Sequence, residues 1–244
     1  MNKILSKDKS LYIMKRNSKY WLKLFTELNA FWEHSGDSND PHALLTKGGH
    51  SGGFINSKIV ILDLKHGPNL CSDIFTSLRQ WGLQHTEISC VVGPASGATK
   101  LAEMMAALIT ECRSKDIPAC RSYSPEKVGE GLDQRMEFPN DVPQAGDIVL
   151  LVEDTITTCG SAQLAIEAIK NCGAAIYPLV GVAANRSGEP TLVLDDDVEI
   201  PIVGLVNKHL PNWSPEDCPL CVSGSEAIRP KEGTNWVDYF TMTS

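Results

Sequence analysis

The segment from residue 148 to residue 170 constrains the fold of this chain more than any other part of the sequence. Five apolar residues, Ile148 to Val152, form a run of the length expected for a strand that is buried on both faces. Two carboxylates, a hydroxyl-rich turn over residues 155–161 and a helical pattern over residues 162–170 follow in that order. In open α/β sheets, a strand, a polar turn and a helix start together form the usual place for a ligand.

The turn and the acidic pair before it suit different parts of one ligand. Backbone N–H groups at a helix start attract anions, and the hydroxyls of Thr157, Thr158 and Ser161 add donors. Gly160 lets the backbone approach closely. The acidic pair repels phosphate but suits sugar hydroxyls, or a Mg²⁺ ion carried by a phosphorylated ligand. The segment therefore fits a sugar phosphate, although acidic and Thr-rich turns also cap ordinary helices. The Gly-Lys-Ser/Thr pattern of P-loops is missing, which argues against ATP γ-phosphate chemistry.

Strands and helices alternate through the middle of the chain. The apolar patterns predict a helix through about residue 35, strands at 59–62, 88–92, 119–123, 148–152, 177–183 and 201–206, and helices at 68–81, 99–112 and 162–170. This alternation predicts an α/β fold with a doubly wound, mostly parallel sheet. We expect three parts: an N-terminal helix and hood segment (1–57), a ligand-binding α/β core (58–206) and an irregular C-terminal hood segment (207–244). The two hood segments are expected to form a small lobe beside the sheet.

Composition excludes several classes of protein. A chain of 244 residues can bury one substantial core. The net charge of −8 argues against a general nucleic-acid binder. No apolar stretch approaches the roughly 18 residues of a membrane span, so none is expected. The first 25 residues are basic and lack the continuous apolar core of a signal peptide, so a cytoplasmic location is the default expectation.

Four further segments carry candidate site residues. Gly93-Pro-Ala-Ser-Gly97 follows a predicted strand and faces the same sheet edge as the 155–161 turn, so it is either a second anion site or an ordinary connection. The glycine-rich ribbon at 44–56 either contributes to the site or is only a flexible hairpin. Arg186 follows the end of a predicted strand. Its guanidinium either donates two parallel hydrogen bonds to a carboxylate or is solvated at the surface. Residues 124–146 contain proline, glycine and charges, and form a long loop or a hairpin.

The eight cysteines fall into two groups. Six are expected to be buried free thiols, because most lie in apolar contexts. Cys218 and Cys221 differ in their two-residue spacing, which leaves open a zinc site or a turn with two free thiols. Since tetrahedral zinc requires four ligands, His209 or a second subunit would have to complete such a site.

The order of parts in residues 148–161 resembles the phosphoribosyl-pyrophosphate (PRPP) motif of type I phosphoribosyltransferases, and orotate phosphoribosyltransferases are the most similar members. The resemblance covers about residues 44–232. By resemblance, Glu153 and Asp154 contact the ribose hydroxyls. The residues that the resemblance assigns to the 5′-phosphate are Thr155, Thr157, Thr158, Cys159, Gly160 and Ser161. Cys159 departs from the family pattern, in which glycine is usual.

The resemblance extends to the other segments. The 93–97 turn is similar to the pyrophosphate-binding loop, with Ala95, Ser96 and Gly97 as contacts, although some members carry a lysine in mid-loop and Lys100 comes later here. The ribbon resembles the segment that lies over the base. The resemblance assigns base contacts to Lys47, Phe54 and Arg186, the last of which follows Asn185 where the family usually has Asp.

A flexible loop in this family carries a lysine onto the pyrophosphate, often onto that of the neighbouring subunit. Lys127 and Arg135 match it best, although the common Lys-Asp-His-Gly signature is missing. With Asp154 they are the catalytic candidates. The resemblance implies a pentosyltransferase of pyrimidine nucleotide biosynthesis that joins a nitrogenous base, with orotate favoured, to PRPP and releases pyrophosphate. It also implies Mg²⁺ brought by PRPP and a homodimer. A purine-type phosphoribosyltransferase and a non-catalytic PRPP-binding regulator remain as alternatives.

Overall fold

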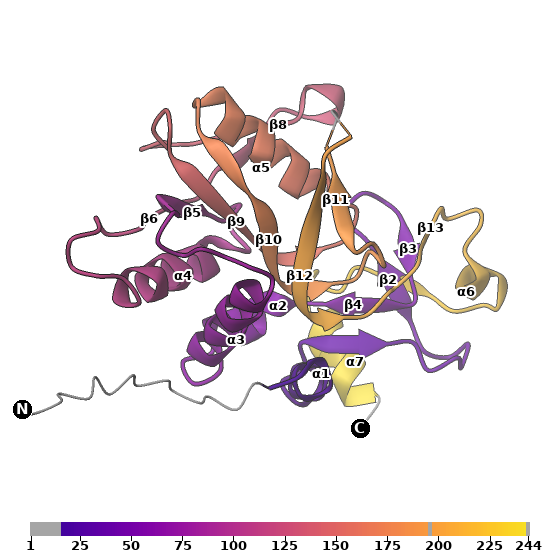
Figure 1. Ribbon diagram of the computed structural model, residues 1–244. Helices are drawn as coiled ribbons and strands as arrows, with labels where there is room; N and C mark the ends of the chain where they lie inside the picture. Colours follow the sequence, from indigo (N-terminus) through magenta and orange to yellow (C-terminus); the bar gives the residue numbers. More distant parts are fainter. Residues whose placement is uncertain (1–15, 195–196, 243–244) are drawn as a thin grey trace, which may run out of the picture.

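A six-stranded sheet forms the centre of the computed structural model, which describes residues 16–194 and 197–242 (Figure 1). From one edge to the other the sheet contains β11 (Thr191–Val193), β12 (Glu199–Asn207), β10 (Ala175–Asn185), β9 (Ile148–Ile156), β5 (Cys90–Val92) and β6 (Arg121–Tyr123). Among these strands β11 runs antiparallel to β12, and the other neighbours are parallel. The predicted α/β fold with a mostly parallel sheet is confirmed.

Side chains alternate across the central strands and so build a core on each face of the sheet. In β9, Leu150 and Val152 belong to one apolar cluster, and Val149 and Leu151 belong to the other. The helices that cover the first face are α1 (Ser18–Glu27), α2 (Ser57–Leu62), α3 (Gly67–Gln80) and α4 (Thr99–Glu111). The opposite face is covered by α5 (Gly160–Asn171) (Figure 1). The sheet is therefore doubly wound, as the sequence predicts.

The strand predicted at 59–62 is wrong, because these residues form helix α2. A short apolar run does not distinguish a strand from a helix by periodicity alone. In α2, Val60 and Ile61 are buried while Leu62 is 53% exposed, so only one side of the segment contacts the core. Packing against α3 and the end of β9 decides the outcome.

Both ends of the chain carry structure that local patterns did not predict. The first helix ends at Glu27, and the following residues form a strand. The tail predicted to be irregular contains short strands and helices. We call β1–β4 together with residues 212–242 the hood; its elements are β1 (Phe31–Glu33), β2 (His42–Leu44), β3 (His50–Ser51), β4 (Gly53–Ile55), β13 (Asn212–Trp213), α6 (Pro219–Val222), β14 (Ala227–Ile228) and α7 (Asn235–Met242).

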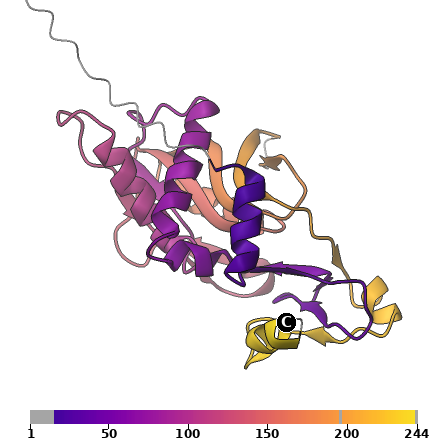
Figure 2. The same ribbon diagram turned by 90° about the horizontal axis from the view of Figure 1, so that it is seen from below.

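Strands from both ends of the chain pair within the hood. One four-stranded sheet has the order β13-β3-β2-β14, and β1 pairs with β4. Figure 2 shows the C-terminal segment beside the N-terminal strands at one end of the molecule. An aromatic cluster joins α7 to these strands, with the rings of Trp32 and Tyr239 4.1 Å apart. Helix α1, in contrast, packs through Trp21 and Phe25 into the main core.

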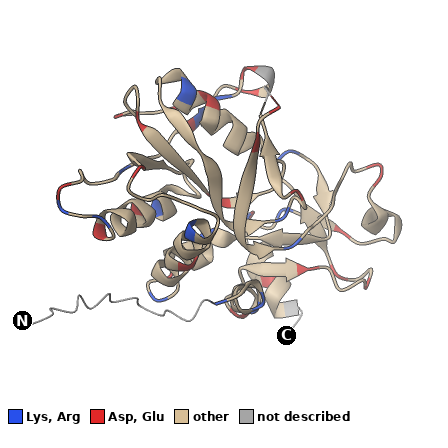
Figure 3. Cartoon of the chain, in the orientation of Figure 1, with Lys and Arg blue, Asp and Glu red and all other residues tan. Residues whose placement is uncertain are grey.

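Charge does not gather on one element. Figure 3 shows basic and acidic residues interspersed over the helices and loops. Within the described ranges, no helix combines the length and the apolar character needed to cross a membrane.

The buried carboxylate of Asp73 on α3 binds Arg16, which precedes α1, and Trp21 of α1, and it provides a stability test. The Asp73 carboxylate accepts from Arg16 Nε at 2.8 Å and from Trp21 Nε1 at 3.0 Å. Asp73→Ala leaves these donors without their acceptor, so we expect the free energy of unfolding to fall by about 2–4 kcal/mol. Urea denaturation measures this, with the exposed Asp37→Ala as the control. A change as small as that of the control would contradict the role given to Asp73.

Candidate active site

A cavity of about 510 Å³ lies at the carboxyl ends of β5 and β9. Because parallel neighbours end at the same edge, this edge receives both the 93–97 turn and the 155–161 turn. The residues predicted for the site that line this cavity are Ala95, Ser96, Gly97, Lys127, Glu153, Asp154, Thr155 and Ser161. Asn56, Lys58 and Lys231 also line it, and the sequence analysis did not select them.

The acidic pair lies within β9 rather than in the turn that follows it. The strand continues to Ile156 because β10 pairs with it as far as Asn185. Successive residues of a strand point to opposite faces, so Glu153 and Asp154 approach the cavity from two sides. Glu153 is 4% exposed, and Asp154 is partly buried.

Burial changes the acidity of both carboxyl groups. It raises the pKa of Glu153 well above its ordinary value, and the neighbouring Asp154 charge raises it further. Burial also raises the pKa of Asp154, although the Thr155 N–H, which donates to Asp154 Oδ1 at 2.7 Å, opposes this change. Two adjacent carboxyl groups in a cleft, both with raised pKa values, are characteristic of a functional site.

The 93–97 turn packs directly on the acidic pair. A Cβ atom built on Gly97 would lie 2.3 Å from Asp154 Oδ2, so only glycine permits this approach. The peptide bond between Ala95 and Ser96 is cis. Lys58 Nζ donates to Ser96 Oγ at 3.2 Å, whereas Lys100 pairs with a glutamate on the surface of α4. The lysine that reaches this turn therefore comes from α2.

The sequence carried little signal for Lys58. It immediately precedes the segment predicted as a strand, and its direction depends on that segment being helical. Its neighbour Ser57 has its Oγ 2.7 Å from Thr155 Oγ1, which fixes the start of α2 against the end of β9. Lys231 was missed for a similar reason, since it lies in the tail that was predicted to be irregular.

The 155–161 turn leads into the N-terminus of α5, as predicted. Cys159 has φ of +60°, a left-handed conformation that favours glycine and explains why glycine is usual at this place. Thr157 and Thr158 are exposed. A second cavity of about 430 Å³ lies over the helix start and includes Gly160 and Ser161.

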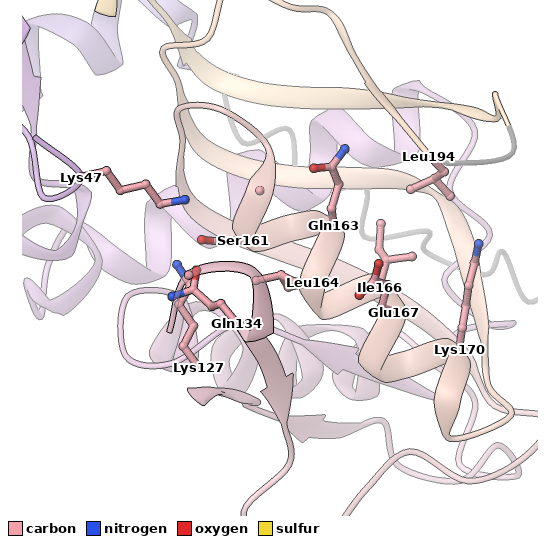
Figure 4. A pocket seen from close by; sticks show the side chains of 12 residues that line it. Lys47, Lys127, Gln134, Ser161, Gln163, Leu164, Ile166, Glu167, Lys170 and Leu194 are labelled. Atoms are coloured by element: carbon pink, nitrogen blue, oxygen red, sulfur yellow. The ribbon is translucent and has the colours of Figure 1, made fainter. Parts of the chain in front are cut away.

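Lysines from two distant segments reach the second cavity. Figure 4 shows Lys47 and Lys127 directed toward the space beside Ser161, with Gln134 next to Lys127. The ammonium groups and the helix N-terminus give this space a positive character that suits an anion.

The charged segment at 124–146 forms a hairpin, one of its two predicted alternatives. Its strands are β7 (Glu126–Val128) and β8 (Arg135–Glu137), with a 3₁₀ turn (Gly131–Asp133) between them. Lys127 pairs with Met136, so both side chains lie on the face that lines the cavity. Arg135 lies on the other face, where its Nε donates to Glu137 Oε1 at 2.7 Å. Of the two cationic candidates, the structure brings only Lys127 to the site.

The three candidates for base contact do not share one cavity. Lys47 is exposed beside α5. The Phe54 ring contacts Trp236, and Lys231 Nζ lies 5.6 Å from its centroid.

Arg186 is buried rather than solvated at the surface. Its Nη2 donates to Ser51 Oγ at 2.7 Å and to Asn212 Oδ1 at 2.8 Å. Burial lowers its pKa to about 10, and its Nε has no partner among the described residues. Arg186 thus connects β10 to hood strands β3 and β13, and its contact with a base stays a prediction.

The Cys218–Cys221 pair lies in the hood, apart from the residues of the PRPP candidate site. His209, suggested above as a third ligand, is exposed, and its Nδ1 lies 2.9 Å from the carbonyl oxygen of Ser187. It is not part of the cluster, which instead contains His42 and His50.

Comparison with known proteins agrees with this architecture. No protein-family model matches the sequence. The structure superposes on the orotate phosphoribosyltransferase of Aeropyrum pernix with a TM-score of 0.54 and 19% identity, covering 76% of this chain and 92% of that one. The fold is thus that of the type I phosphoribosyltransferases.

Sequence relatives specify the family. An orotate phosphoribosyltransferase of Sulfurimonas denitrificans is 33% identical over 201 residues, which cover 78% of this chain and 90% of the relative. One from Caldicellulosiruptor bescii is 29% identical over 214 residues, 88% of this chain and 97% of the relative. The chain belongs to the orotate phosphoribosyltransferase family.

Proposed function

We propose that this protein transfers the phosphoribosyl group of PRPP to orotate and releases pyrophosphate. The observation that carries the proposal is the cavity in which the 95–97 turn, the acidic pair and the start of α5 converge. The sequence relatives are named orotate phosphoribosyltransferases, so a purine acceptor is not favoured.

Each end of PRPP has matching groups in the cavities. Glu153 and Asp154 accept hydrogen bonds from the ribose hydroxyls, since ionised carboxylates are acceptors only. The 5′-phosphate lies in the 155–161 turn, where backbone N–H groups and the α5 dipole attract an anion. Ser161, which lines both cavities, adds a hydroxyl between the sugar and the phosphate.

The pyrophosphate lies against the 95–97 turn. As the bond from C1 to the pyrophosphate oxygen breaks, the electron pair leaves with pyrophosphate and C1 becomes cation-like. A nitrogen of the base then gives its electron pair to the new bond to C1, and the proton of that nitrogen is released to solvent. Lys58 and Lys127 line this side of the cavity and stabilise the charge that develops on the leaving group. Catalysis is mainly positioning and electrostatics.

Mg²⁺ bound through PRPP fits the oxygen-rich donor set of the cavity. When it is bound, the ion neutralises part of the pyrophosphate charge. The contacts that orient the sugar come from the acidic pair, and the 95–97 turn excludes water from one side of it.

The direct test measures pyrophosphate release with PRPP, Mg²⁺ and one base at a time. We expect release with orotate that exceeds release with adenine, guanine or uracil by at least about 10²-fold, because a buried polar site penalises a base that leaves it unpaired. Preference for a purine would overturn the assignment of the base. Binding of PRPP with no release for any base would instead identify a regulator.

The raised pKa values of the acidic pair predict the acid side of the pH profile. The ribose contacts need ionised carboxylates, and a raised pKa means that protonation begins at a higher pH than for an ordinary carboxyl group near pH 4. We therefore expect kcat/KM for PRPP to decline as the pH falls through these raised values. A profile that stays flat until pH 4 would contradict this role.

We also propose that the chain is a homodimer, as the family resemblance implies. Size-exclusion chromatography with light scattering tests this, and a mass corresponding to one chain across micromolar concentrations would refute it.

A further inference from the structure

Four potential metal ligands meet in the hood, away from the residues proposed to bind PRPP. His42 lies on β2 and His50 on β3, while Cys218 precedes α6 and Cys221 lies within it. The four ligand atoms all lie within 4.8 Å of one another. His42, His50 and Cys218 are buried, and Cys221 closes the cluster toward the surface.

Four of the six distances within the cluster are close to those between the ligands of one tetrahedral ion. Zinc bonds of about 2.3 Å to sulfur and 2.0–2.1 Å to nitrogen place neighbouring ligand atoms roughly 3.3–3.8 Å apart. His42 Nε2 lies 3.6 Å from Cys218 Sγ and 3.4 Å from Cys221 Sγ. His50 Nδ1 lies 3.2 Å from Cys221 Sγ and 3.0 Å from His42 Nε2. A small contraction or expansion of these contacts is sufficient to hold an ion at the centre.

The hydrogen bonds around His42 orient its lone pair toward the cluster. Ser225 Oγ donates its one hydrogen to the carbonyl oxygen of Asp40 at 2.7 Å. The same Oγ lies 2.9 Å from His42 Nδ1 and must therefore accept the Nδ1 hydrogen. In a neutral ring, Nε2 then carries the lone pair that a metal requires. An outer hydrogen bond that selects the ligating nitrogen in this way is characteristic of metal-bound histidines.

We propose that His42, His50, Cys218 and Cys221 bind one structural zinc ion. Two thiolates and two imidazoles select zinc over the oxygen-seeking Mg²⁺ that accompanies PRPP. Four protein ligands leave no open position, so the site is structural rather than catalytic. The zinc site takes no direct part in the phosphoribosyl transfer proposed above.

The ion connects parts of the chain that are far apart in sequence. His42 and Cys218 are separated by 176 positions, and their strands and helix bury few apolar side chains. Zinc therefore supplies stability that the small apolar cluster of the hood does not. His42 and His50 flank the turn that presents Lys47 to the second cavity, so the ion also holds that turn in place.

The experiment uses the full chain without a histidine tag, dialysed against metal-free buffer. Elemental analysis and native mass spectrometry are expected to find about one zinc ion per chain. Replacement by Co²⁺ is expected to give the intense visible bands of tetrahedral cobalt together with thiolate charge transfer. A folded chain that retains no zinc and gives no tetrahedral cobalt spectrum would overturn the proposal, leaving a hydrogen-bonded pair of imidazoles beside two thiols.

Variants then test the ligand set. Cys221→Ser changes the ligand nearest the surface, and we expect zinc affinity to fall at least 10-fold. Cys112→Ser, which changes an exposed thiol at the end of α4, should bind zinc like the parent. Equal affinity in the two variants would refute the ligand assignment.

Hydrogen exchange locates the effect of the metal. Chelation is expected to reduce protection in the hood strands while leaving β9 and β10 protected, and unchanged protection in the hood would contradict a structural role. These measurements need neither PRPP nor a base. A zinc-loaded chain without transferase activity would reject the proposed function and keep the zinc site, and an active chain without zinc would do the reverse.

Discussion

The double variant Asp154→Asn, Thr158→Ala is expected to lose about 10²–10⁴-fold in kcat/KM for PRPP while keeping its fold. A charge-assisted hydrogen bond contributes about 1.5–3 kcal/mol, and the variant removes one acceptor for the sugar and one donor for the phosphate. Every 1.4 kcal/mol corresponds to a factor of ten. Steady-state kinetics with PRPP as the varied substrate measures the loss, and circular dichroism checks the fold. Unchanged kinetics would refute the assignment of this site.

Substitution of the same acidic pair is expected to raise the stability of the folded protein although it lowers activity. Folding raises the pKa of each carboxyl group above its value in the unfolded chain. The folded state therefore loses stability as the pH rises from the unfolded-state pKa to the folded-state pKa, and the whole loss is present at any higher pH. At neutral pH, Asp154→Asn and Glu153→Gln should therefore each raise the free energy of unfolding, by about 0.5–2 kcal/mol. The exposed Glu216→Gln serves as the control in urea denaturation. A loss of stability would show that the pair has a structural role instead.

Gly97→Ala is the second variant for which we expect a large effect. The added methyl group would lie 2.3 Å from Asp154 Oδ2 and 2.5 Å from its Cγ, so either the carboxylate or the 95–97 turn must move. Displacement of a positioning group by about 1 Å can cost a factor of 10² in rate. We expect kcat/KM for PRPP to fall by about that factor.

Gly52→Ala is the matched control, because its nearest new contacts are ordinary ones at 3.6 Å. It should retain parental kinetics and stability. If Gly97→Ala also retained them, the close packing between the turn and Asp154 would have no part in catalysis.

Lysines from three separate segments line the main cavity. Lys58 comes from α2, Lys127 from the β7–β8 hairpin and Lys231 from the hood. The 93–97 turn has no lysine in mid-loop, and Lys58 contacts its Ser96 from α2. A cation acts at a distance through its charge, so its position in space matters more than its position in the sequence.

The sequence by itself determined the central part of this protein. The continuous apolar run at the start of β9, Ile148 to Val152, is a local signal of a strand buried on both faces. The amphipathic patterns of α3, α4 and α5, which repeat about every 3.6 residues, are local signals of helices. The 155–161 turn is equally local, because glycine and hydroxyl side chains act on backbone within a few positions. For these reasons the parallel sheet, its two faces and the phosphate candidate loop could all be predicted.

Only the tertiary structure decided the remaining features. Residues 59–62 are helical because of what they pack against, β9 lengthens because β10 pairs with it, and Lys127 rather than Arg135 faces the site because of the hairpin register. The hood joins His42 and His50 to Cys218 and Cys221 across most of the chain. These outcomes depend on partners outside the local segment, as far as 176 positions away for His42 and Cys218. A local pattern carries no information about which partner a side chain will meet.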